Sequence, residues 1–527
     1  MNLSIEFERL SNSYLKMVDQ PVGSRIRDGD GYCGTIRYVG SVAHAKNQAD
    51  VYFGVEWDNK KRGKHDGSCV DKEGKLHRYF TCDETAGSFV KPNKIQVGRS
   101  FLEAMQERYV QMDAPLVAPD NIVPGAFVTT SKGNSKPIEL VGETKIRKWQ
   151  QIAGLEKIAM RSDTISSAGE ELEANIGHMV EVDLQDNLIY EWKEVASLVG
   201  QMPLLSTLLL HGNAMEPFTP PVAASLPAAC FAPLRVLALN GCRMDSWMQV
   251  ARLEAMLPNL EELYLSKNSL ADLPIYGAAA AGSTVFSQVT SSVAPAGEVT
   301  GFANLRVLDV SGCGLTSWNQ VLSLAFLPRL QDLLLDENPL PSVSATPTGA
   351  FSTLQRMSIS STHVTSWADV DALNGFPALT YLRLSHVPLF KGKGASEVRP
   401  VVIARMANLA FFNGSKVQGR ERMDSEKSYI RRVLRERTEL EEGAKDVVAL
   451  PHPRFEALHD YYKAEMLDFG RSEQGPNLAS NMLEIVFKNL CFSSSSLEPL
   501  TKKVPGSVKV AQLKAMVKQL FKVPPPL

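Results

Sequence analysis

The chain has 527 residues, too many for a single hydrophobic core, so we expect about three or four domains. Its apolar fraction of 44% and charged fraction of 22% are ordinary for soluble globular proteins. Lys plus Arg total 56 and Asp plus Glu total 58, so the overall charge gives no support to nucleic-acid binding, and any electrostatic preference must be local.

Three further features narrow the class of protein. The seven cysteines form no CxxC pair and no Cys/His cluster of zinc-like spacing, so we expect free thiols in a reducing compartment and no metal site. Charged residues interrupt the segment 1–19, which excludes a signal-peptide core. No apolar run of about 18 residues is present to span a membrane. These features favour a cytoplasmic protein with several domains.

Residues 20–98 favour a small all-β domain. Two Asp-Gly turn signals near residue 30 precede four β-rich runs, at 35–39, 51–57, 76–80 and 88–90. Short strands joined by glycine-rich turns, without helical periodicity, are typical of a β-barrel or sandwich.

The loop 63–67 is the strongest functional candidate in this domain. It places Lys64, His65 and Asp66 between Gly63 and Gly67, and glycine lets a loop take φ > 0 and lets another backbone approach closely. Aromatic residues and lysines flank the loop, a combination that suits an extended peptide with an acidic or aromatic end. We therefore interpret the loop as a peptide-binding element rather than a purely structural turn.

Three ordered motifs in this region resemble the CAP-Gly domain family: GVEWD at 54–58, GKHDG at 63–67 and GSFVKPNK at 87–94. Because CAP-Gly domains bind the acidic, aromatic-ended tail of α-tubulin and related tails, the resemblance implies an α-tubulin tail site. Their most frequent loop is GKNDG, and His65 in place of the Asn implies some pH dependence near neutrality. The implied site comprises Phe53, Trp57, Gly63, Lys64, His65, Asp66, Gly67, Phe89 and Lys91.

The resemblance also assigns roles within this site. It places Lys64 and His65 on the carboxylates of the peptide, and the aromatic residues in a groove beside them. Structural alternatives exist, because Phe53 and Trp57 are equally well explained as core residues of a small β domain. Lys91 is equally well explained as part of a solvated basic edge.

Residues 99–150 are expected to form a connector. A helix-like pattern covers 100–111, and prolines and glycines then interrupt it. We expect a tether with a short helix, which lets the first domain move relative to the next.

Residues 151–415 contain about nine leucine-rich repeats. The pattern LxxLxL, closed by a small or polar residue, recurs mostly every 24 to 29 residues. Its matches begin at Leu155, Met179, Leu205, Leu234, Leu260, Leu305, Leu330, Leu354 and Leu379. The pattern predicts an α/β solenoid in which alternate leucines of a short strand enter the core. The closing residue, Asn or Cys, is expected to satisfy backbone groups at the following turn.

Four tryptophans support this register. Trp192, Trp247, Trp318 and Trp367 recur at one offset in alternate repeats, each before a helix-like run. Such a stripe can form a binding ladder, but its fixed offset on the convex side predicts packing instead. The interval between Leu260 and Leu305 is wider, and we expect a flexible insertion near 276–297, with a degenerate repeat as the alternative.

The residues that flank the core leucines are expected on the concave surface, the usual recognition face of a solenoid. The candidates in the middle repeats are Glu181, Asp183, Glu262, Tyr264, Asp309, Asp332 and Asp336, and the cations toward the two ends are Lys157, Arg161, Arg356 and Arg383. An acidic centre favours a large partner with a basic patch, whereas solvation alone explains such charges equally well.

Residues 416–475 favour a helical cap and linker. Tyr429, Ile430, Val433 and Leu434 form an amphipathic pattern that suits capping of the repeat core, and the acidic residues interleaved in it argue against a nucleic-acid-binding helix. Residues 481–527 contain two strand patterns and a helix pattern, which resemble the opening half of a ubiquitin-like (β-grasp) fold. The later strands of that fold have no counterpart, so we expect an incomplete ubiquitin-like domain.

The order of these segments resembles that of the tubulin-folding cofactor E family, whose members are also called tubulin-specific chaperones E. The segments 101–110 and 413–415 and the GKHDG form of the loop are similar to that family too. The resemblance implies a chaperone that binds α-tubulin, its tail through the CAP-Gly domain and its body through the repeats. It also implies action on the αβ-tubulin dimer with cofactors D and C and a small GTPase, in the cytoplasm and at the cytoskeleton.

The sequence contains no Walker-type phosphate loop, no Gly-x-Ser-x-Gly motif and no metal-ligand cluster, so we expect no enzymatic activity and no cofactor. The main alternative function is a microtubule-end adaptor that recruits a partner through its repeats, although no sustained heptad run is present. A ubiquitin or proteasome shuttle is a weaker alternative.

Overall fold

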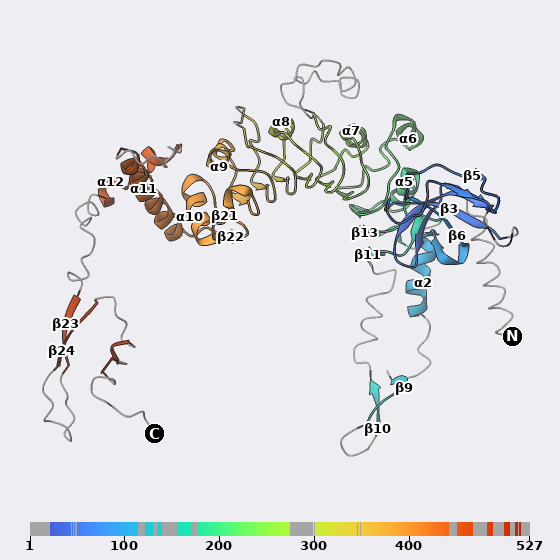
Figure 1. Ribbon diagram of the computed structural model, residues 1–527, viewed down its shortest axis with the longest axis horizontal. Coiled ribbons are helices and arrows are strands. Elements are labelled where there is room, and N and C mark those ends of the chain that lie inside the picture. Colours follow the sequence, from blue (N-terminus) through green and yellow to red (C-terminus); the bar gives the residue numbers. More distant parts are fainter. Residues whose placement is uncertain are drawn as a thin grey trace. The chain divides into compact units, whose positions relative to one another are not determined.

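The structure is a computed structural model whose chain divides into two compact units, Met1–Arg422 and Met423–Leu527 (Figure 1). It describes residues 22–43, 45, 47, 50–113, 122–129, 135–139, 155–170, 176–274, 299, 301–344, 346–347, 349–441, 451–466, 482–487, 500–505, 512–514 and 516–517.

An antiparallel β domain forms the N-terminal part of the first unit. Its five-stranded sheet has the order β6-β3-β2-β1-β7, and β4 and β5 form a separate hairpin. The strands are β1 (Arg25–Asp28), β2 (Cys33–Gly40), β3 (Tyr52–Trp57), β4 (Ser68–Val70), β5 (Leu76–Arg78), β6 (Gly87–Val90) and β7 (Ile95–Val97). A small core that includes Ile26, Ile36 and Val55 lies against this sheet. All four predicted β-rich runs contain strands, which confirms the small all-β domain.

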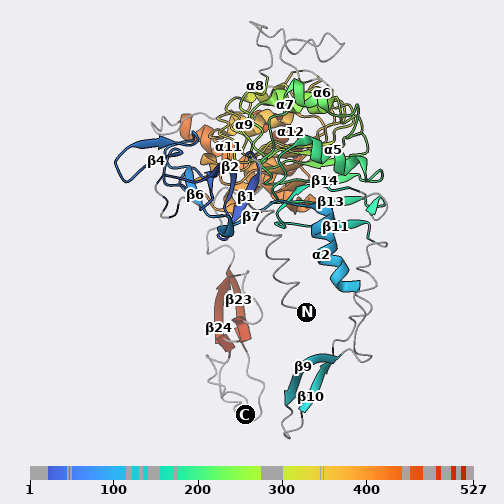
Figure 2. The same ribbon diagram turned by 90° about the vertical axis from the view of Figure 1, so that its right-hand side faces the viewer.

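The segment that follows is packed rather than flexible, which corrects the expectation of a tether for residues 99–113. Strand β8 (Arg99–Ser100) pairs in parallel with β12 (Ile165–Ser167) of the first repeat. Helix α2 (Phe101–Asp113) then buries Phe101 and Met105 in the same core cluster as the repeats. Figure 2 shows α2 next to the strands β11 (Lys157–Ala159), β13 (Glu181–Asp183) and β14 (Thr207–Leu209). The apolar stripe that predicts a helix therefore covers the N-terminal end of the solenoid.

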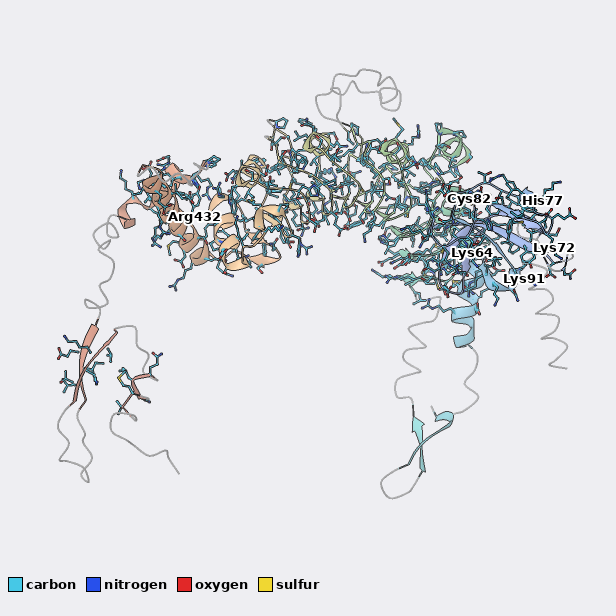
Figure 3. The ribbon with its side chains drawn as sticks, viewed as in Figure 1. Lys64, Lys72, His77, Cys82, Lys91 and Arg432 are labelled. Carbon is cyan, nitrogen blue, oxygen red and sulfur yellow. The ribbon has the colours of Figure 1, made fainter. Side chains whose placement is uncertain are left out.

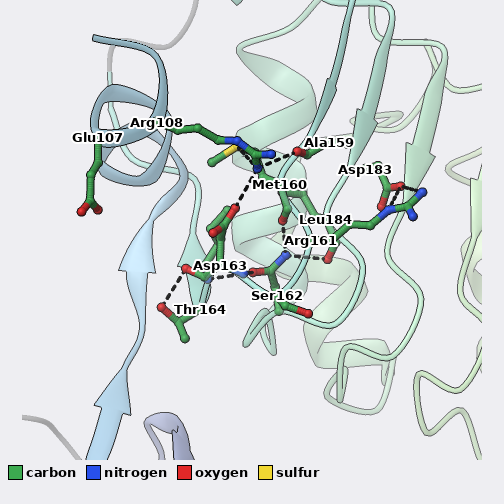
Figure 4. Close-up of polar contacts among 12 residues, drawn as sticks. Glu107, Arg108, Ala159, Met160, Arg161, Ser162, Asp163, Thr164, Asp183 and Leu184 are labelled. Carbon is green, nitrogen blue, oxygen red and sulfur yellow. Dashed lines mark hydrogen bonds and ion pairs between the residues drawn. The ribbon is translucent and has the colours of Figure 1, made fainter. Parts of the chain in front are cut away.

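Asp163 joins this segment to the first repeat through two arginines (Figure 4). Arg108 of α2 forms an ion pair with Asp163 at 3.3 Å and donates a hydrogen bond to the carbonyl oxygen of Ala159 at 3.0 Å. Arg99 of β8 donates through Nε to the carbonyl oxygen of Asp163 at 2.8 Å. Beyond α2, β9 (Ile122–Thr129) and β10 (Ser135–Glu139) form a hairpin, and the rest of the predicted connector lies outside the described residues.

The β domain also contacts the turns that follow the first repeat strands. Arg27 donates hydrogen bonds to the carbonyl oxygens of Ser162, at 2.9 Å, and Asp186. Arg243 forms an ion pair with Asp58 at 2.7 Å. Ser162 and Asp186 have positive φ, 57° and 54°, and occupy equivalent turn positions of the first two repeats. Arg243, with a φ of 63°, lies at a later position in the turn of its own repeat. These contacts fix the β domain on the N-terminal repeats.

Nine parallel strands each begin two residues after a predicted LxxLxL start, which confirms the register of the leucine-rich repeats. They are β11 (Lys157–Ala159), β13 (Glu181–Asp183), β14 (Thr207–Leu209), β15 (Val236–Ala238), β16 (Glu262–Tyr264), β17 (Val307–Asp309), β18 (Asp332–Leu334), β19 (Arg356–Ser358) and β20 (Tyr381–Arg383). The sheet continues into β21 (Phe411–Phe412), parallel to β20, and β22 (Ser415–Lys416), antiparallel to β21.

The wide interval between two of the predicted repeats adds no strand to this sheet. β16 and β17 pair directly, with Leu263 opposite Leu308, in the register that the other neighbouring strands share. This pairing excludes a degenerate repeat between them. The predicted insertion at 276–297 itself lies outside the described residues.

The closing residues satisfy backbone groups inside the solenoid, as predicted. Asn213 donates to the carbonyl oxygens of Leu184 and Leu210 at 2.9 Å and accepts from the backbone N–H of Ile189 at 3.1 Å. The Cys242 thiol donates to the same Leu210 oxygen at 3.1 Å. Asn187, Asn268 and Asn338 also donate to carbonyl oxygens of their own and the preceding repeat.

The helices of the repeats lie on the side opposite the sheet (Figure 1). They are α5 (Trp192–Gly200), α6 (Pro220–Ser225), α7 (Trp247–Glu254), α8 (Trp318–Leu322) and α9 (Trp367–Ala372). Four of them begin at the predicted tryptophans, whose side chains are all buried, and this burial confirms a packing role. The 3₁₀ turns η4 (Leu373–Gly375) and η5 (Pro388–Phe390), helix α10 (Ala395–Arg405) and the β21–β22 hairpin follow.

Helix α11 (Gly419–Glu441) leads into the second unit, which also contains α12 (Phe455–Met466) and an antiparallel hairpin of β23 (Met482–Phe487) and β24 (Leu500–Pro505). Tyr429, Ile430 and Val433 are buried as expected, whereas Leu434 is 40% exposed. The predicted capping by α11 and the incomplete ubiquitin-like domain stay predictions.

Candidate functional site

Backbone hydrogen bonds hold the loop 63–67 against strand β6. The N–H groups of Lys64 and His65 donate to the carbonyl oxygen of Gly87 at 2.7 and 3.2 Å, and the N–H of Gly87 donates to that of His65 at 2.8 Å. A Cβ atom on Gly63 would lie 2.4 Å from the carbonyl carbon of Ala86. Only glycine permits this approach, so Gly63 fixes the point from which Lys64 and His65 project.

Gly67 closes the loop in a conformation that other residues rarely adopt. Its φ is +92°, and a Cβ there would lie 2.2 Å from the carbonyl oxygen of Phe80. Its own carbonyl oxygen accepts a hydrogen bond from the N–H of Tyr79 at 3.0 Å. Both glycines therefore shape the loop for the reason that the sequence suggests.

Asp66 is engaged by the loop itself, and its contact with a peptide stays a prediction. One carboxylate oxygen accepts hydrogen bonds from the backbone N–H and the hydroxyl of Ser68, and the other pairs with Arg78 at 2.6 Å. These interactions, first with Ser68 and then with Arg78, hold the pKa of Asp66 well below its usual range. Asp66 thus stays ionised and positions the loop, because Ser68 and Arg78 already occupy most of its acceptor positions.

His65 and Phe89 form one stacked pair. Their ring centroids are 4.6 Å apart and the rings are inclined by 27°. The N–H of Gly67 donates to His65 Nδ1 at 3.1 Å, which assigns the ring proton of the neutral form to Nε2. His65 can therefore offer Nε2–H as a hydrogen-bond donor, whereas protonation of Nδ1 would break its contact with Gly67.

An open groove of about 590 Å³ runs beside this stacked pair. Figure 3 shows Lys64 in this part of the N-terminal domain. The groove is lined by Asp28, Gly29, Asp30, Trp57, Arg62, Lys64, His65, Ser88, Phe89, Val90 and Lys94. Lys64 is exposed, and no ion pair joins it to another described residue. The combination of ammonium groups, a ring N–H and an aromatic stack matches the chemistry of an acidic, aromatic-ended peptide.

Lys94, not Lys91, lines the groove, which corrects the second predicted lysine contact. Lys91 pairs with Asp50 at 2.9 Å and lies over the ring of Tyr52, with its Nζ 5.8 Å from the centroid. The 3₁₀ turn η1 (Pro92–Lys94) separates the two lysines and gives them different directions. The sequence shows both lysines but not the turn geometry that distinguishes them.

Arg62 is a groove residue that the sequence interpretation missed. Its guanidinium pairs with Asp28 at 2.8 Å and lies 5.3 Å from the ring centroid of Trp57 and 5.1 Å from that of Tyr32. The sequence signal that could have identified Arg62 is its position directly before Gly63 of the GKHDG loop. Asp28 at the end of β1 and Asp30 in the following turn both form ion pairs with Arg62, at 2.8 and 3.3 Å, on this side of the groove.

Two of the predicted aromatic contacts belong to the core of the domain. Phe53 is 0% exposed and packs with Ile26 and Ile36, so it cannot line the groove. Trp57 is also buried, although part of it reaches the groove wall. Strand alternation explains their burial, because Phe53, Val55 and Trp57 share the face of β3 that meets the core. The structural alternative holds for Phe53.

The concave face of the solenoid consists of two rows of residues that the strand register defines. The first row contains Lys157, Glu181, Thr207, Val236, Glu262, Val307, Asp332, Arg356, Tyr381, Phe411 and Lys416. The second row contains Ala159, Asp183, Leu209, Ala238, Tyr264, Asp309, Leu334, Ser358 and Arg383. All the predicted concave residues except Arg161 and Asp336 lie in these rows.

Most of the predicted acidic centre is paired within the sheet. Three ion pairs join neighbouring strands: Lys157 with Glu181 at 2.6 Å, Arg161 with Asp183 at 2.6 Å and Arg356 with Asp332 at 2.7 Å. Asp336 accepts a hydrogen bond from the Ser358 hydroxyl at 2.6 Å, and Glu262 accepts one from the Tyr264 hydroxyl at 2.7 Å. Cations therefore neutralise Glu181, Asp183 and Asp332 across the strands. Among the described residues no cation forms an ion pair with Glu262, Asp309 or Asp336, so the expected acidic centre stays a prediction.

His211 is a half-buried residue near this surface that the sequence interpretation did not single out. Burial lowers the pKa of its imidazole, although Asp183 and Asp186 oppose that shift. Its signal in the sequence is weak, because a lone His after a repeat strand has many structural roles.

Among the described residues, no group of three or more His, Cys, Asp or Glu side chains could hold a metal ion. In the same part of the chain, no helix is long and apolar enough to cross a bilayer.

Comparison with known proteins gives one matching domain family and several relatives along nearly the whole chain. Residues 22–95 match the CAP-Gly domain family. Tubulin-specific chaperone E of Danio rerio is 30% identical over 525 residues, which cover 96% of this chain and 92% of that protein. The Homo sapiens protein of the same name is 30% identical over 522 residues, covering 95% and 90%. Tubulin-folding cofactor E of Arabidopsis thaliana is 30% identical over 503 residues, covering 93% and 87%.

Proposed function

The chain belongs to the tubulin-specific chaperone E family, and from that premise we propose that it binds α-tubulin at two surfaces. The acidic tail of α-tubulin occupies the groove beside the GKHDG loop, and the tubulin body contacts the repeats. In this role the chain takes part, with cofactors D and C and a small GTPase, in assembly and dissociation of the αβ-tubulin dimer.

The single observation that carries tail binding is the His65–Phe89 stack in a groove that Lys64 and Lys94 also line. An acidic tail supplies carboxylates for the two ammonium groups and for His65 Nε2–H, in charge-assisted hydrogen bonds. A terminal aromatic ring extends the stack on Phe89. Arg62 on the other side of the groove already pairs with Asp28 and Asp30, so we expect the tail to place its carboxylates at the lysine side of the groove.

The packed junction supports cooperation between the two surfaces. The contacts of Arg27 with Ser162 and of Asp58 with Arg243 attach the groove domain to the repeats, so a bound tail keeps the tubulin body near the solenoid. Two weak contacts linked in this way bind more tightly than either contact alone. On the concave face, Glu262, Tyr264 and Asp309 are the central candidates for the body contact, since the outer acidic residues are occupied by ion pairs.

We further propose a cytoplasmic, cytoskeleton-associated protein without catalytic activity of its own. In this view the hairpin of β23 and β24 belongs to an incomplete ubiquitin-like domain. GTP hydrolysis during dimer assembly would then belong to tubulin and the partner GTPase.

The test is incubation of the purified chain with αβ-tubulin, with and without cofactors D and C and the GTPase, followed by size-exclusion chromatography. A chaperone forms a complex with the dimer or releases its subunits. Co-sedimentation with polymerised microtubules separates the adaptor alternative, because an adaptor pellets with the polymer. A chain that neither binds the dimer nor changes its stability would contradict the chaperone function.

A further inference from the structure

The last strands of the solenoid carry a stacked aromatic pair on the concave face, with one ring exposed and the other half-buried. Tyr381 of β20 and Phe411 of β21 are neighbours in the first row, with ring centroids 5.7 Å apart and an interplanar angle of 26°. Phe411 is 37% exposed, and Tyr381 is half-buried. An aromatic side chain left open at a recognition face indicates a contact surface.

Cations surround this pair. Lys416 of β22 lies opposite Phe411 in the strand register, and Arg383 lies two residues beyond Tyr381 on the same face of β20. Both side chains are exposed, and no ion pair joins either one to another described residue. On the other side, Arg356 neighbours Tyr381 but is neutralised by Asp332 at 2.7 Å. The surface of Arg356, Tyr381, Arg383, Phe411 and Lys416, called here the terminal patch, therefore has a net positive charge.

The terminal patch repeats the chemistry of the N-terminal groove on a different fold. The groove combines a stacked pair at 4.6 Å and 27° with Lys64 and Lys94. The patch combines a stacked pair at 5.7 Å and 26° with two cations that lack ion-pair partners among the described residues. Similar groups in a similar arrangement select similar ligands, here carboxylates beside an aromatic ring.

We propose that the terminal patch is a second binding site for an acidic peptide that carries an aromatic residue. The aromatic side chain of the peptide packs on Phe411 and Tyr381, and its carboxylates pair with Arg383 and Lys416. Charge complementarity favours a peptide over single-stranded nucleic acid, because binding of a phosphate backbone requires a longer basic stripe and Asp332 lies in the same row. The chain thus holds two acidic segments at once, one at each end of its first unit.

The site is tested by fluorescence anisotropy with a labelled poly-glutamate peptide that ends in tyrosine. The full chain carries Lys64→Ala and His65→Ala, which remove the groove contacts, so that any remaining binding reports on the terminal patch. We expect Phe411→Ala to weaken this remaining binding roughly fivefold or more, and Arg383→Glu to weaken it by at least as much. Lys193→Glu, which reverses an exposed cation on the convex helix α5, is the matched control and should leave binding unchanged.

Three outcomes would overturn the assignment: no peptide binding by the Lys64→Ala/His65→Ala chain, remaining binding that Phe411→Ala and Arg383→Glu do not change, or a uridine oligonucleotide that binds more tightly and displaces the peptide. Circular dichroism of each variant verifies that its fold is retained. Failure of the groove is distinguishable from failure of the patch, because an inactive groove makes Lys64→Ala silent while Phe411→Ala still weakens binding.

Discussion

Two lysines of the N-terminal domain provide a matched test of the groove. Lys64 and Lys91 are both exposed and both belong to motifs that resemble CAP-Gly domains, yet they have different surroundings. Lys64 lines the groove, whereas Lys91 is paired with Asp50 at 2.9 Å. Replacement of either lysine by alanine removes the same charge from the same domain, so a difference in peptide affinity reports on position alone.

The expected loss for Lys64→Ala follows from the contact that it removes. A fully exposed ion pair contributes up to about 1 kcal/mol, and a charge-assisted hydrogen bond that is partly shielded from water contributes about 1.5–3 kcal/mol. Lys64 is exposed but borders the His65–Phe89 stack, so we expect a loss of about 1–2 kcal/mol, or roughly 5- to 30-fold in Kd. For Lys91→Ala we expect a change of less than about twofold.

The assay is fluorescence anisotropy of an α-tubulin tail peptide at constant pH, first at low salt and then at physiological ionic strength. The effect of Lys64→Ala should shrink as salt rises, because screening weakens the contact in the native chain. Equal losses for the two variants would refute the assignment of the groove. A silent Lys64→Ala variant would refute it as well.

Three further variants test individual structural roles. Gly67→Ala should abolish tail binding in a chain that stays folded. Its φ of +92° and the 2.2 Å distance from the added Cβ to the carbonyl oxygen of Phe80 force the loop to move. Retained affinity for the tail would show that the shape of the loop is unimportant. Asn213→Ala should lower the free energy of unfolding by about 1–3 kcal/mol in urea titration, because the buried N–H of Ile189 loses its partner and the carbonyl oxygens of Leu184 and Leu210 each lose one of their donors. A change below about 0.5 kcal/mol would contradict this role. Burial lowers the pKa of His211 in the folded chain, so its contribution to stability is present above the unfolded value of about 6.5 and is lost as pH falls. The melting temperature of His211→Asn should therefore decrease less than that of the native chain when the pH is lowered from about 7 to about 5.5. Parallel curves of melting temperature against pH for the two chains would exclude the effect.

The repeat domain was predictable because its pattern recurs. Every predicted start, from Leu155 to Leu379, lies two residues before an observed strand, and one register error would have displaced the whole series. The ion pairs across the strands have a sequence signal that the prediction did not use. Lys157 and Glu181, like Asp332 and Arg356, are separated by one repeat length, so opposite charges at equivalent positions face each other in the sheet.

The groove was predictable in its loop but not in its walls. Lys64, His65 and the two glycines belong to one short motif whose geometry is local. The role of Phe53 depends on which face of β3 meets the core, and the roles of Lys91 and Lys94 depend on a single 3₁₀ turn. The expectation of a flexible tether was wrong because it also depends on distant contacts. The apolar stripe of α2 predicts a helix, but the surface that buries this stripe belongs to the repeats and is not visible in the local sequence.

The central claim is that groove and repeats bind one tubulin molecule together. Its most direct test compares the affinity of the native chain for αβ-tubulin with and without the α-tubulin tail, alongside the Lys64→Ala/His65→Ala chain. We predict that removal of the tail and mutation of the groove each weaken binding by tenfold or more, that their combination adds little, and that measurable binding through the repeats remains. Equal affinity for intact and tailless tubulin, or additive losses from the two changes, would contradict the claim.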